Sequence, residues 1–156
     1  MAIAWRLVDP RYADDLEGTG NRLHGARWNS PGRGVLYCAE NLSLCVLENL
    51  VHMPAALREK LPPRLALKIE FPDGAAVTDI ERQLERTSAT ACRAVGDRWL
   101  DVSSTLVLRA PSVIVPQDRN LMFNPRHRLM SEVKVIAGEL FDFDSRLWDA
   151  GRLKGE

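Results

Sequence analysis

The sequence predicts an α+β fold in which helices flank a mixed or antiparallel sheet. The chain has 156 residues, the size of one domain, so we expect a single domain over residues 1–156. Hydrophobic residues make up 46% and charged residues 27% of the chain, as in soluble globular proteins. Apolar runs typical of strands outnumber helix-like segments, and most of them lie in the second half. This order favours a mixed or antiparallel sheet over a doubly wound parallel one.

The first third of the chain contains two expected strands separated by a long loop. Residues 5–8 form a short strand-like run that Asp9-Pro10 ends. Residues 17–34 contain five glycines and one proline, and we expect them to form a loop. Loops of more than about 12–15 residues in compact domains usually carry function or are disordered. The apolar run at 35–39 then predicts a buried strand.

The next segment is an apolar helix that carries one acidic residue. Asn41 or Ser43 can cap a helix that extends to about residue 52. Its side chains are apolar on nearly every side, which places the helix in the core. Glu48 shares the stripe of Leu44, so its carboxylate must be paired, be protonated or line a cleft. A buried ion pair, or a position at the edge of the stripe, would be a purely structural role.

Six more strands and one more helix are expected after this segment. A strand at 64–71 leads into a turn at 72–74. Thr87 or Ser88 can start a helix that extends to about Leu100. The remaining apolar runs predict strands at 76–80, 106–108, 113–115, 121–123 and 133–143.

Net charge and hydropathy narrow the classes of function. The chain has 21 basic and 21 acidic residues, so it lacks the basic excess of a general nucleic-acid binder. No run approaches the 18 or so apolar residues that cross a bilayer, so we expect no membrane span. The first eight residues lack the layout of a signal peptide. We therefore expect a cytoplasmic protein.

The cysteines and histidines do not form a metal-binding or disulfide pattern. Three cysteines are too few, and wrongly spaced, for a disulfide framework or a thiolate metal site, so each is expected to be a buried apolar residue. No two of the three histidines have the short spacing of zinc ligands. We predict no metal site.

Three further segments contain candidates for binding. In residues 25–32, Arg27 offers a bidentate fork to a phosphate and Trp28 a broad apolar face; the alternative is a surface turn with an anchoring tryptophan. Ser112 separates two apolar runs and can bind a ligand hydroxyl or satisfy the backbone at a bulge. Residues 120–128 can contact phosphate or form a solvated basic loop.

Taken together, these motifs resemble the RES-domain family of bacterial toxins. The similarity spans nearly the whole chain and is carried by the stretches GARWNSPG (25–32), VLYCAE (35–40), LENLVH (47–52), APSVIVP (110–116), NLMFNPRH (120–127) and FDFDSRLW (141–148). The arginine, glutamate and serine that give the family its name match Arg27, Glu48 and Ser112. His24-Gly25-Ala26 departs from the adjacent glycines that often precede the family's arginine.

The resemblance implies an ADP-ribosyltransferase-like fold and an enzyme that consumes NAD. It implies catalytic roles for Arg27, Glu48 and Ser112, and NAD contacts from these three and from Trp28, Tyr37 and Asn124. It also implies an Xre-like antitoxin that covers the active site, and a homodimer within that complex. It leaves open the roles of His52, Asn120 and Arg126.

Three functions remain open at this level. The first is a toxin that cleaves NAD and passes ADP-ribose to phosphate or water. The second is a mono-ADP-ribosyltransferase that modifies a host protein. The third is a non-catalytic module that binds a nucleotide or a partner. No motif in the chain encodes the acceptor of ADP-ribose.

Overall fold

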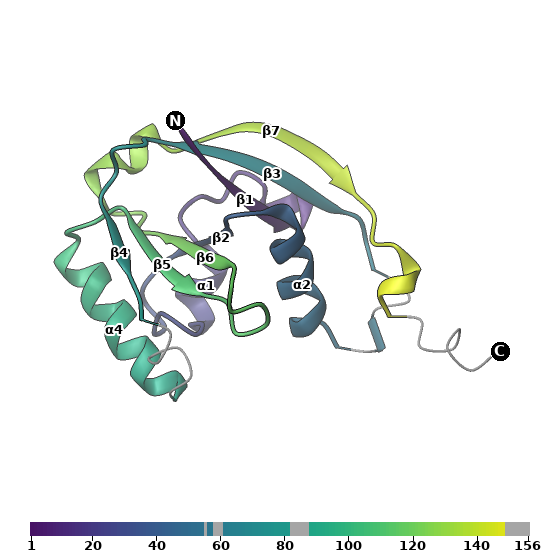
Figure 1. The fold of residues 1–156 in the computed structure, drawn as a ribbon, viewed down its shortest axis with the longest axis horizontal. Helices are drawn as coiled ribbons and strands as arrows, with labels where there is room; N and C mark the ends of the chain where they lie inside the picture. The colour runs from purple at the N-terminus through teal and green to yellow at the C-terminus, as the bar shows by residue number, and fades with distance from the viewer. Residues whose placement is uncertain (55, 58–60, 82–87, 149–156) are drawn as a thin grey trace.

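The computed structural model describes residues 1–54, 56–57, 61–81 and 88–148. One seven-stranded sheet runs through this part of the chain, and helices pack against it (Figure 1). The strands are β1 (Ala2–Val8), β2 (Leu36–Ala39), β3 (Arg64–Phe71), β4 (Val77–Asp79), β5 (Val107–Pro111), β6 (Arg119–Phe123) and β7 (Lys134–Phe141). The α-helices are α1 (Thr19–His24), α2 (Leu42–His52) and α4 (Ala89–Val102), and the 3-10 helices are η1 (Pro10–Tyr12), η3 (Arg128–Glu132) and η4 (Ser145–Leu147).

The sheet is mixed, which confirms the predicted α+β class. Its strand order is β4-β5-β6-β2-β1-β3-β7. Strands β4 and β5 pair in parallel, and every other pair is antiparallel. The strands β2 and β6 therefore lie in the middle of the sheet, where each has a neighbour on both sides.

Helices α2 and α4 cover two regions of the same face of the sheet (Figure 1). The strand register places Met122 and Leu7 on this face, because Met122 pairs with Tyr37 and Ala39 pairs with Trp5. Met122 packs in the core below α4, and Leu7 packs in the core below α2. A third core, on the opposite face, is built around residues such as Phe123. The face between α2 and α4 is the one that carries the candidate site.

Residues 17–34 are not the continuous loop that the glycine content predicts. They contain α1, whose first turn is fixed by Asp15: its carboxylate accepts hydrogen bonds from the backbone N–H of Thr19 at 2.9 Å and from the Thr19 hydroxyl at 3.1 Å. Gly18 has φ of +66°, and a Cβ there would lie 2.1 Å from the carbonyl oxygen of Val35. Some of the glycines thus serve close packing of the segment against β2 rather than an open loop.

The predicted strand at 113–115 is also wrong, because a side chain takes the hydrogen bonds that a strand would need. The hydroxyl of Ser112 accepts the backbone N–H groups of Ile114 at 3.1 Å and Val115 at 3.2 Å, which curls the segment after β5. Apart from this run, each predicted strand overlaps an observed one within a few residues.

The caps of the two longer helices agree with the prediction. Asn41 caps α2 by accepting the N–H of Leu44 at 2.8 Å, and Ser88 caps α4 by accepting the N–H of Ala91 at 3.2 Å. Thr87, the other cap candidate for α4, lies outside the described residues. Helix α2 is not buried all round, since Val51 is 59% exposed.

Gly96 in α4 is a point of close packing rather than a weak point of the helix. A Cβ at this position would lie 1.8 Å from the carbonyl oxygen of Trp28, so the backbone of residues 25–30 rests directly on α4. Only glycine allows this approach, because the atom that it would meet belongs to the backbone.

We expect Gly96→Ala to lower the free energy of unfolding by about 1–3 kcal/mol, the usual cost of overpacking. Gly20→Ala is the matched control: Gly20 lies in α1 with no atom within 4 Å of the place that a methyl group would take, so alanine should raise stability by about 0.5–1 kcal/mol. Urea unfolding measures both values. An unchanged midpoint for Gly96→Ala would contradict the close contact with Trp28.

Candidate active site

The site is organised by the amino end of α2 and by the turn between β5 and β6. Asn41, besides capping α2, donates a hydrogen bond from its Nδ2 to Asp118 Oδ2 at 3.1 Å. Asp118 closes the turn through its N–H, which donates to the carbonyl of Val115 at 2.9 Å. This hydrogen bond joins the helix to the turn without any contribution from Glu48.

Glu48 projects from α2 toward this turn and is held by one of its two oxygens. Its Oε1 accepts hydrogen bonds from Ser112 Oγ at 3.0 Å and from Asn120 Nδ2 at 2.8 Å. Its Oε2 accepts no hydrogen bond from any residue that the structure describes, and lies 3.9 Å from His52 Nδ1. The side chain is 24% exposed. The carboxylate is thus fixed in orientation while one oxygen remains available to a ligand.

Ser112 is fully buried, and its hydroxyl is saturated within the protein. The O–H donates to Glu48, and the oxygen accepts the two N–H groups of the turn described above. One donor and two acceptor sites are all that a hydroxyl has. Ser112 therefore satisfies the backbone, one of the two roles expected from the sequence, and it also orients Glu48.

His52 lies one helical turn after Glu48, at the end of α2. Its Nδ1 is 2.8 Å from the carbonyl oxygen of Glu48, and because a carbonyl only accepts, Nδ1 carries the proton. The imidazole is 78% exposed. Its ring lies next to the free oxygen of Glu48.

The loop that carries Arg27 is held rigidly by α4. Gly25, with φ of +71°, starts a tight turn in which the N–H of Ala26 donates to the carbonyl of Asn29 at 2.9 Å. Arg93 Nε donates to the carbonyl of Ala26 at 3.0 Å, and Asp97 Oδ1 accepts the N–H of Ser30 at 2.9 Å. Arg27 itself is half-buried. Its backbone therefore has little freedom to move.

Tyr37 fixes the same loop from the sheet. Its hydroxyl accepts the N–H of Trp28 at 3.1 Å and donates to Asn29 Oδ1 at 2.9 Å. Burial raises the pKa of the Tyr37 phenol, so the hydroxyl stays protonated and able to donate. Trp28 is 3% exposed and packs in the core below α4, the anchoring role that the sequence left open.

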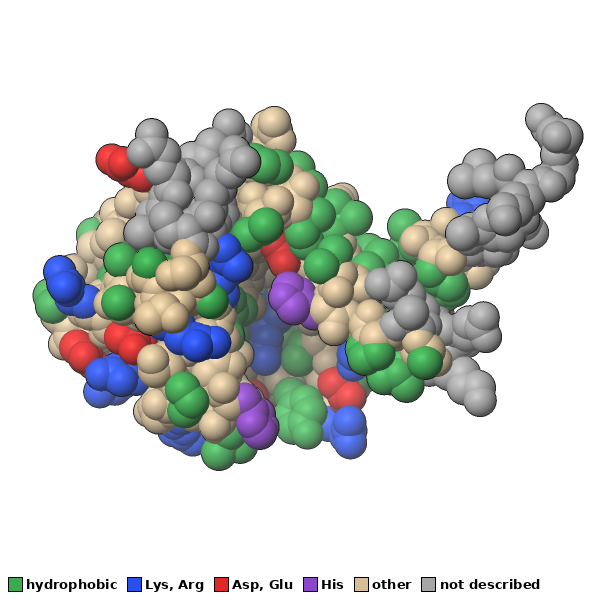
Figure 2. All heavy atoms as spheres, turned by 90° about the horizontal axis from the view of Figure 1, so that it is seen from below, with side chains coloured by type: hydrophobic (Ala, Val, Ile, Leu, Met, Phe, Trp, Pro, Cys, Tyr) green, Lys and Arg blue, Asp and Glu red, His purple; other side chains and the backbone are tan. Residues whose placement is uncertain are grey.

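Strand register brings the arginine loop and Glu48 to one face of the sheet. Tyr37 pairs with Met122, and Asn120 lies two residues before Met122 on the same strand. The side chains of Tyr37 and Asn120 therefore share a face, and such diagonal neighbours are about 7–8 Å apart. Figure 2 views the molecule from below and shows a hollow in this side, with basic side chains inside it and histidine at its edge.

Asn124, which we expected to contact NAD, lies at the other end of β6. It lies four positions after Asn120, a distance of roughly 13 Å in extended chain. It is fully buried, its Nδ2 donates to Ser103 Oγ at 3.1 Å, and its Oδ1 accepts the N–H of Arg126 at 3.0 Å. The structure does not bring Asn124 together with Glu48.

Asn120 is the site residue that sequence reasoning did not assign. The sequence placed Asn120 in the basic segment 120–128, whose role was left open. The only feature that distinguished it was its position as a polar residue before an apolar run. The contact with Glu48 depends on the register of β6 against β2, where Asn120 pairs with Ala39. Sequence periodicity predicts the strand but carries no information about that register.

The described residues offer no obvious metal or thiol chemistry. Within the described ranges, no group of three or more histidine, cysteine, aspartate or glutamate side chains is placed to hold a metal ion. Cys38, Cys45 and Cys92 are buried, and burial raises the pKa of the Cys38 thiol and that of Cys45, the latter to about 12. Thiols in such surroundings are poor nucleophiles. No described helix is both long and apolar enough to cross a membrane.

Comparisons with known proteins agree with the motif pattern. The sequence profile of the RES domain matches residues 3–145. A protein named Toxin Res from Pseudomonas putida is 36% identical over 148 residues, which cover 94% of this chain and 99% of the relative. A second Toxin Res, from Photorhabdus laumondii, is 34% identical over 155 residues, which cover 93% and 96%.

Two further similarities concern a named activity and the fold. A protein named Prs ADP-ribosylating toxin from Sphingobium sp. is 32% identical over 155 residues, covering 92% of this chain and 94% of the relative. A chain in the crystal structure of the M. tuberculosis MbcT–MbcA toxin–antitoxin complex superposes with a TM-score of 0.71, over 98% of this chain and 90% of that one. At 17% identity this likeness shows the fold alone.

These matches confirm the resemblance that the ordered motifs raised. The profile covers most of the chain, and relatives above 30% identity align along nearly their whole length. The chain therefore belongs to the RES domain family.

Proposed function

We propose that this protein is the toxin of a bacterial toxin–antitoxin pair, and that it cleaves the nicotinamide–ribose bond of NAD and passes ADP-ribose to phosphate or water. The observation that carries the proposal is the carboxylate of Glu48. One of its oxygens is fixed by Ser112 and Asn120, and the other is available on a hollowed face. Such a toxin would act in the cytoplasm of the cell that makes it.

The chemistry of NAD explains why one carboxylate is enough. Ordinary glycosidases need a second carboxyl group to protonate the leaving oxygen. The nicotinamide of NAD is a cationic pyridinium, and it departs as a neutral base with the electron pair of the C–N bond. The positive charge then develops on the ribose, where Glu48 Oε2 would stabilise it electrostatically. Phosphate adds directly to the ribose carbon, whereas water loses a proton to the solvent as it adds.

The other residues would bind and orient NAD. Arg27, on its rigid loop, would bind the pyrophosphate or the attacking phosphate through its guanidinium fork. Tyr37 would position that loop, and its ring remains a candidate to stack on nicotinamide. Ser112 and Asn120 would act through Glu48. A direct contact of Ser112 with a ribose hydroxyl would require the serine to give up a hydrogen bond that it now makes.

A second candidate function is the transfer of ADP-ribose to a specific protein. The observation that favours it is the 32% identical relative whose name describes an ADP-ribosylating toxin. Both functions use the same carboxylate and differ in the acceptor. A binding module without catalysis is the third possibility, and it predicts no release of nicotinamide.

An antitoxin that covers the active site fits the apolar side chains at its rim. Val51 follows Glu48 by three residues, Val113 follows Ser112 directly, and each is 59% exposed. Exposed apolar groups beside a polar site are typical of protein interfaces. The fold neighbour in a toxin–antitoxin complex supports a partner of this kind. An Xre-type antitoxin and a homodimer within the complex remain predictions.

Glu48→Gln should reduce nicotinamide release by about 10²–10³-fold, the usual effect of removing one electrostatic stabiliser of a transition state. The glutamine can keep its amide oxygen on the two donors and would place an uncharged NH₂ where Oε2 now lies. Stability should therefore change by less than about 1 kcal/mol. Nicotinamide release by the purified protein, together with urea unfolding, measures both effects.

The products of the same assay identify the acceptor. With labelled NAD, ADP-ribose or its 1″-phosphate supports NAD cleavage, and a labelled protein band in lysate supports protein modification. A well-folded wild type that binds NAD but releases no nicotinamide would contradict both enzyme proposals. Wild-type turnover by Glu48→Gln would contradict the role of Glu48.

Asn120→Asp should move the acid limb of the kcat profile to higher pH. The new carboxylate would lie beside that of Glu48, and like charges at hydrogen-bond distance raise the pKa of at least one member of the pair. Asn120→Ala should lower kcat by about tenfold, the value of one hydrogen bond to a charged group, with KM nearly unchanged. A pH profile unaffected by the aspartate would show that Asn120 does not act on Glu48.

Val51→Asp and Val113→Asp should weaken inhibition by the cognate antitoxin by at least tenfold, because each places a charge in the covered surface. Val102→Asp is the control, since Val102 is 66% exposed at the far end of α4. Titration of NAD cleavage with purified antitoxin measures the effect. Equal inhibition of all three variants would place the antitoxin elsewhere.

A further inference from the structure

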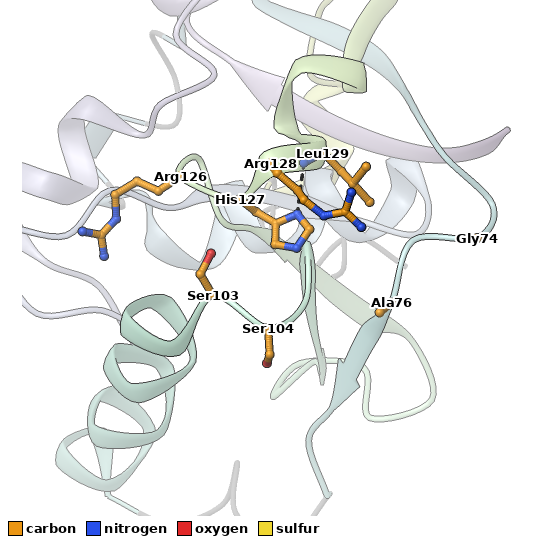
Figure 3. A pocket seen from close by; sticks show the side chains of 8 residues that line it. All are labelled: Gly74, Ala76, Ser103, Ser104, Arg126, His127, Arg128 and Leu129. Atoms are coloured by element: carbon orange, nitrogen blue, oxygen red, sulfur yellow. Dashed lines mark hydrogen bonds between the residues drawn. The ribbon is translucent and has the colours of Figure 1, made fainter.

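A second polar cavity lies at the end of β6 that is remote from Glu48. Its volume is about 470 Å³. Ser103 and Ser104, which follow α4, form one wall, and Arg126, His127 and Arg128, which follow β6, form the other (Figure 3). The turn at Gly74 closes a third side. None of the residues that line the cavity is acidic.

The buried Asn124 joins the two walls. Its Nδ2 donates to Ser103 Oγ at 3.1 Å, and its Oδ1 accepts the N–H of Arg126 at 3.0 Å. Its backbone carbonyl accepts the N–H of His127 at 3.1 Å. An asparagine that is fully buried and bonded to both sides holds the serines and the basic residues in one arrangement.

Ser103 adopts a conformation that normally selects glycine. Its φ of 52° makes it the one non-glycine residue with positive φ among the residues described. At the carboxyl end of a helix this position is usually glycine, so the serine carries a conformational cost. Its hydroxyl accepts the hydrogen bond from Asn124 and keeps its own proton free to donate.

His127 presents a donor to the cavity. Its Nδ1 accepts the N–H of Leu129 at 3.2 Å, so in the neutral ring the proton lies on Nε2. Figure 3 shows the ring with its other nitrogen turned toward the side where Ser104 lies. The serines and the histidine therefore offer donors to a common space.

Arg128 gives the cavity a positive charge. Arg126 forms an ion pair with Asp101, in which Nη2 lies 3.6 Å from Oδ1. Arg128 is exposed and forms no ion pair with any residue in the described part of the chain. Donor groups beside an uncompensated guanidinium favour an anion, and arginine suits phosphate in particular because its fork binds two oxygens.

We propose that this cavity binds the phosphate group of a small phosphorylated molecule. Its volume lies within the 300–1,000 Å³ of typical small-molecule sites and exceeds what a phosphate ion alone would fill. The site lies roughly 13 Å from Asn120 along β6, so it is separate from the proposed catalytic site at Glu48. Arg128 binds the phosphate, and the serine hydroxyls and the histidine Nε2–H orient it.

The test is an NMR titration of the ¹⁵N-labelled protein, without NAD, with inorganic phosphate, AMP or adenosine. Phosphate and AMP should shift the amide signals of Ser103, Ser104 and Arg128, and adenosine should not. Arg128→Ala should weaken binding of AMP at least tenfold, and Ser104→Ala should weaken it several-fold. Both residues are exposed, so the variants should fold normally.

Arg98→Ala is the matched control, because Arg98 is an exposed arginine of α4 that does not line the cavity. It should bind AMP as the wild type does. If Arg98→Ala weakened AMP binding as much as Arg128→Ala, the loss would reflect the net charge of the protein and not a contact in the cavity. If adenosine shifted the amide signals as much as AMP, the cavity would recognise the nucleoside and not the phosphate. Either result, or unshifted cavity amides, would overturn the proposal. Because no NAD is turned over, these outcomes are independent of the proposed catalysis.

Discussion

A single carboxylate oxygen joins helix α2 to both arms of the β5–β6 hairpin, which lies far along the sequence from the helix. Glu48 Oε1 binds Ser112 from the turn after β5 and Asn120 from the start of β6. Holding an anion with two neutral donors on one oxygen leaves the other oxygen unsatisfied, which is costly unless a ligand or water reaches it. The arrangement is therefore a poor way to stabilise a fold and a good way to present a negative charge to a ligand. The links that support it, Asn41 to Asp118 and Ser112 to its own turn, serve to keep that geometry.

The positive side of the site is built by different means. Arg27 belongs to a loop whose backbone is fixed on both sides, by α4 through Arg93 and Asp97 and by the sheet through Tyr37. The absence of a side chain at Gly96 lets α4 approach this loop. Rigid placement of this kind lowers the entropy that a ligand must lose on binding. The loop that carries Arg27 and the carboxylate of Glu48 are thus held by separate parts of the fold, on the same face of the sheet.

Many helices and strands of this fold could be predicted from the sequence, because short-range patterns of apolar and capping residues determine them. The alternation at 64–71 and the caps Asn41 and Ser88 are short-range features, and they predicted the elements correctly. The failures come from side chains that bond to the backbone a few residues away, which apolar periodicity does not reveal: Asp15 starts α1 inside an expected loop, and Ser112 removes an expected strand. Glu48 was singled out because a carboxylate in an apolar helix conflicts with burial. Asn120 was not assigned, because its role depends on strand register and conflicts with nothing local.

Asn120 and Asn124 show how one strand can support two sites without joining them. Asn120 lies in β6 and Asn124 directly follows it. Each holds a partner from another element, Glu48 in one case and the end of α4 in the other. Strand β6 is hydrogen-bonded to β5 and to β2 along its length, so it cannot shift as a unit without breaking both ladders. A ligand changes a distant site only when it binds two conformations with different affinity. A strand with one accessible position offers no second conformation, and we therefore expect the cavity beside Arg128 and the carboxylate of Glu48 to bind their ligands independently.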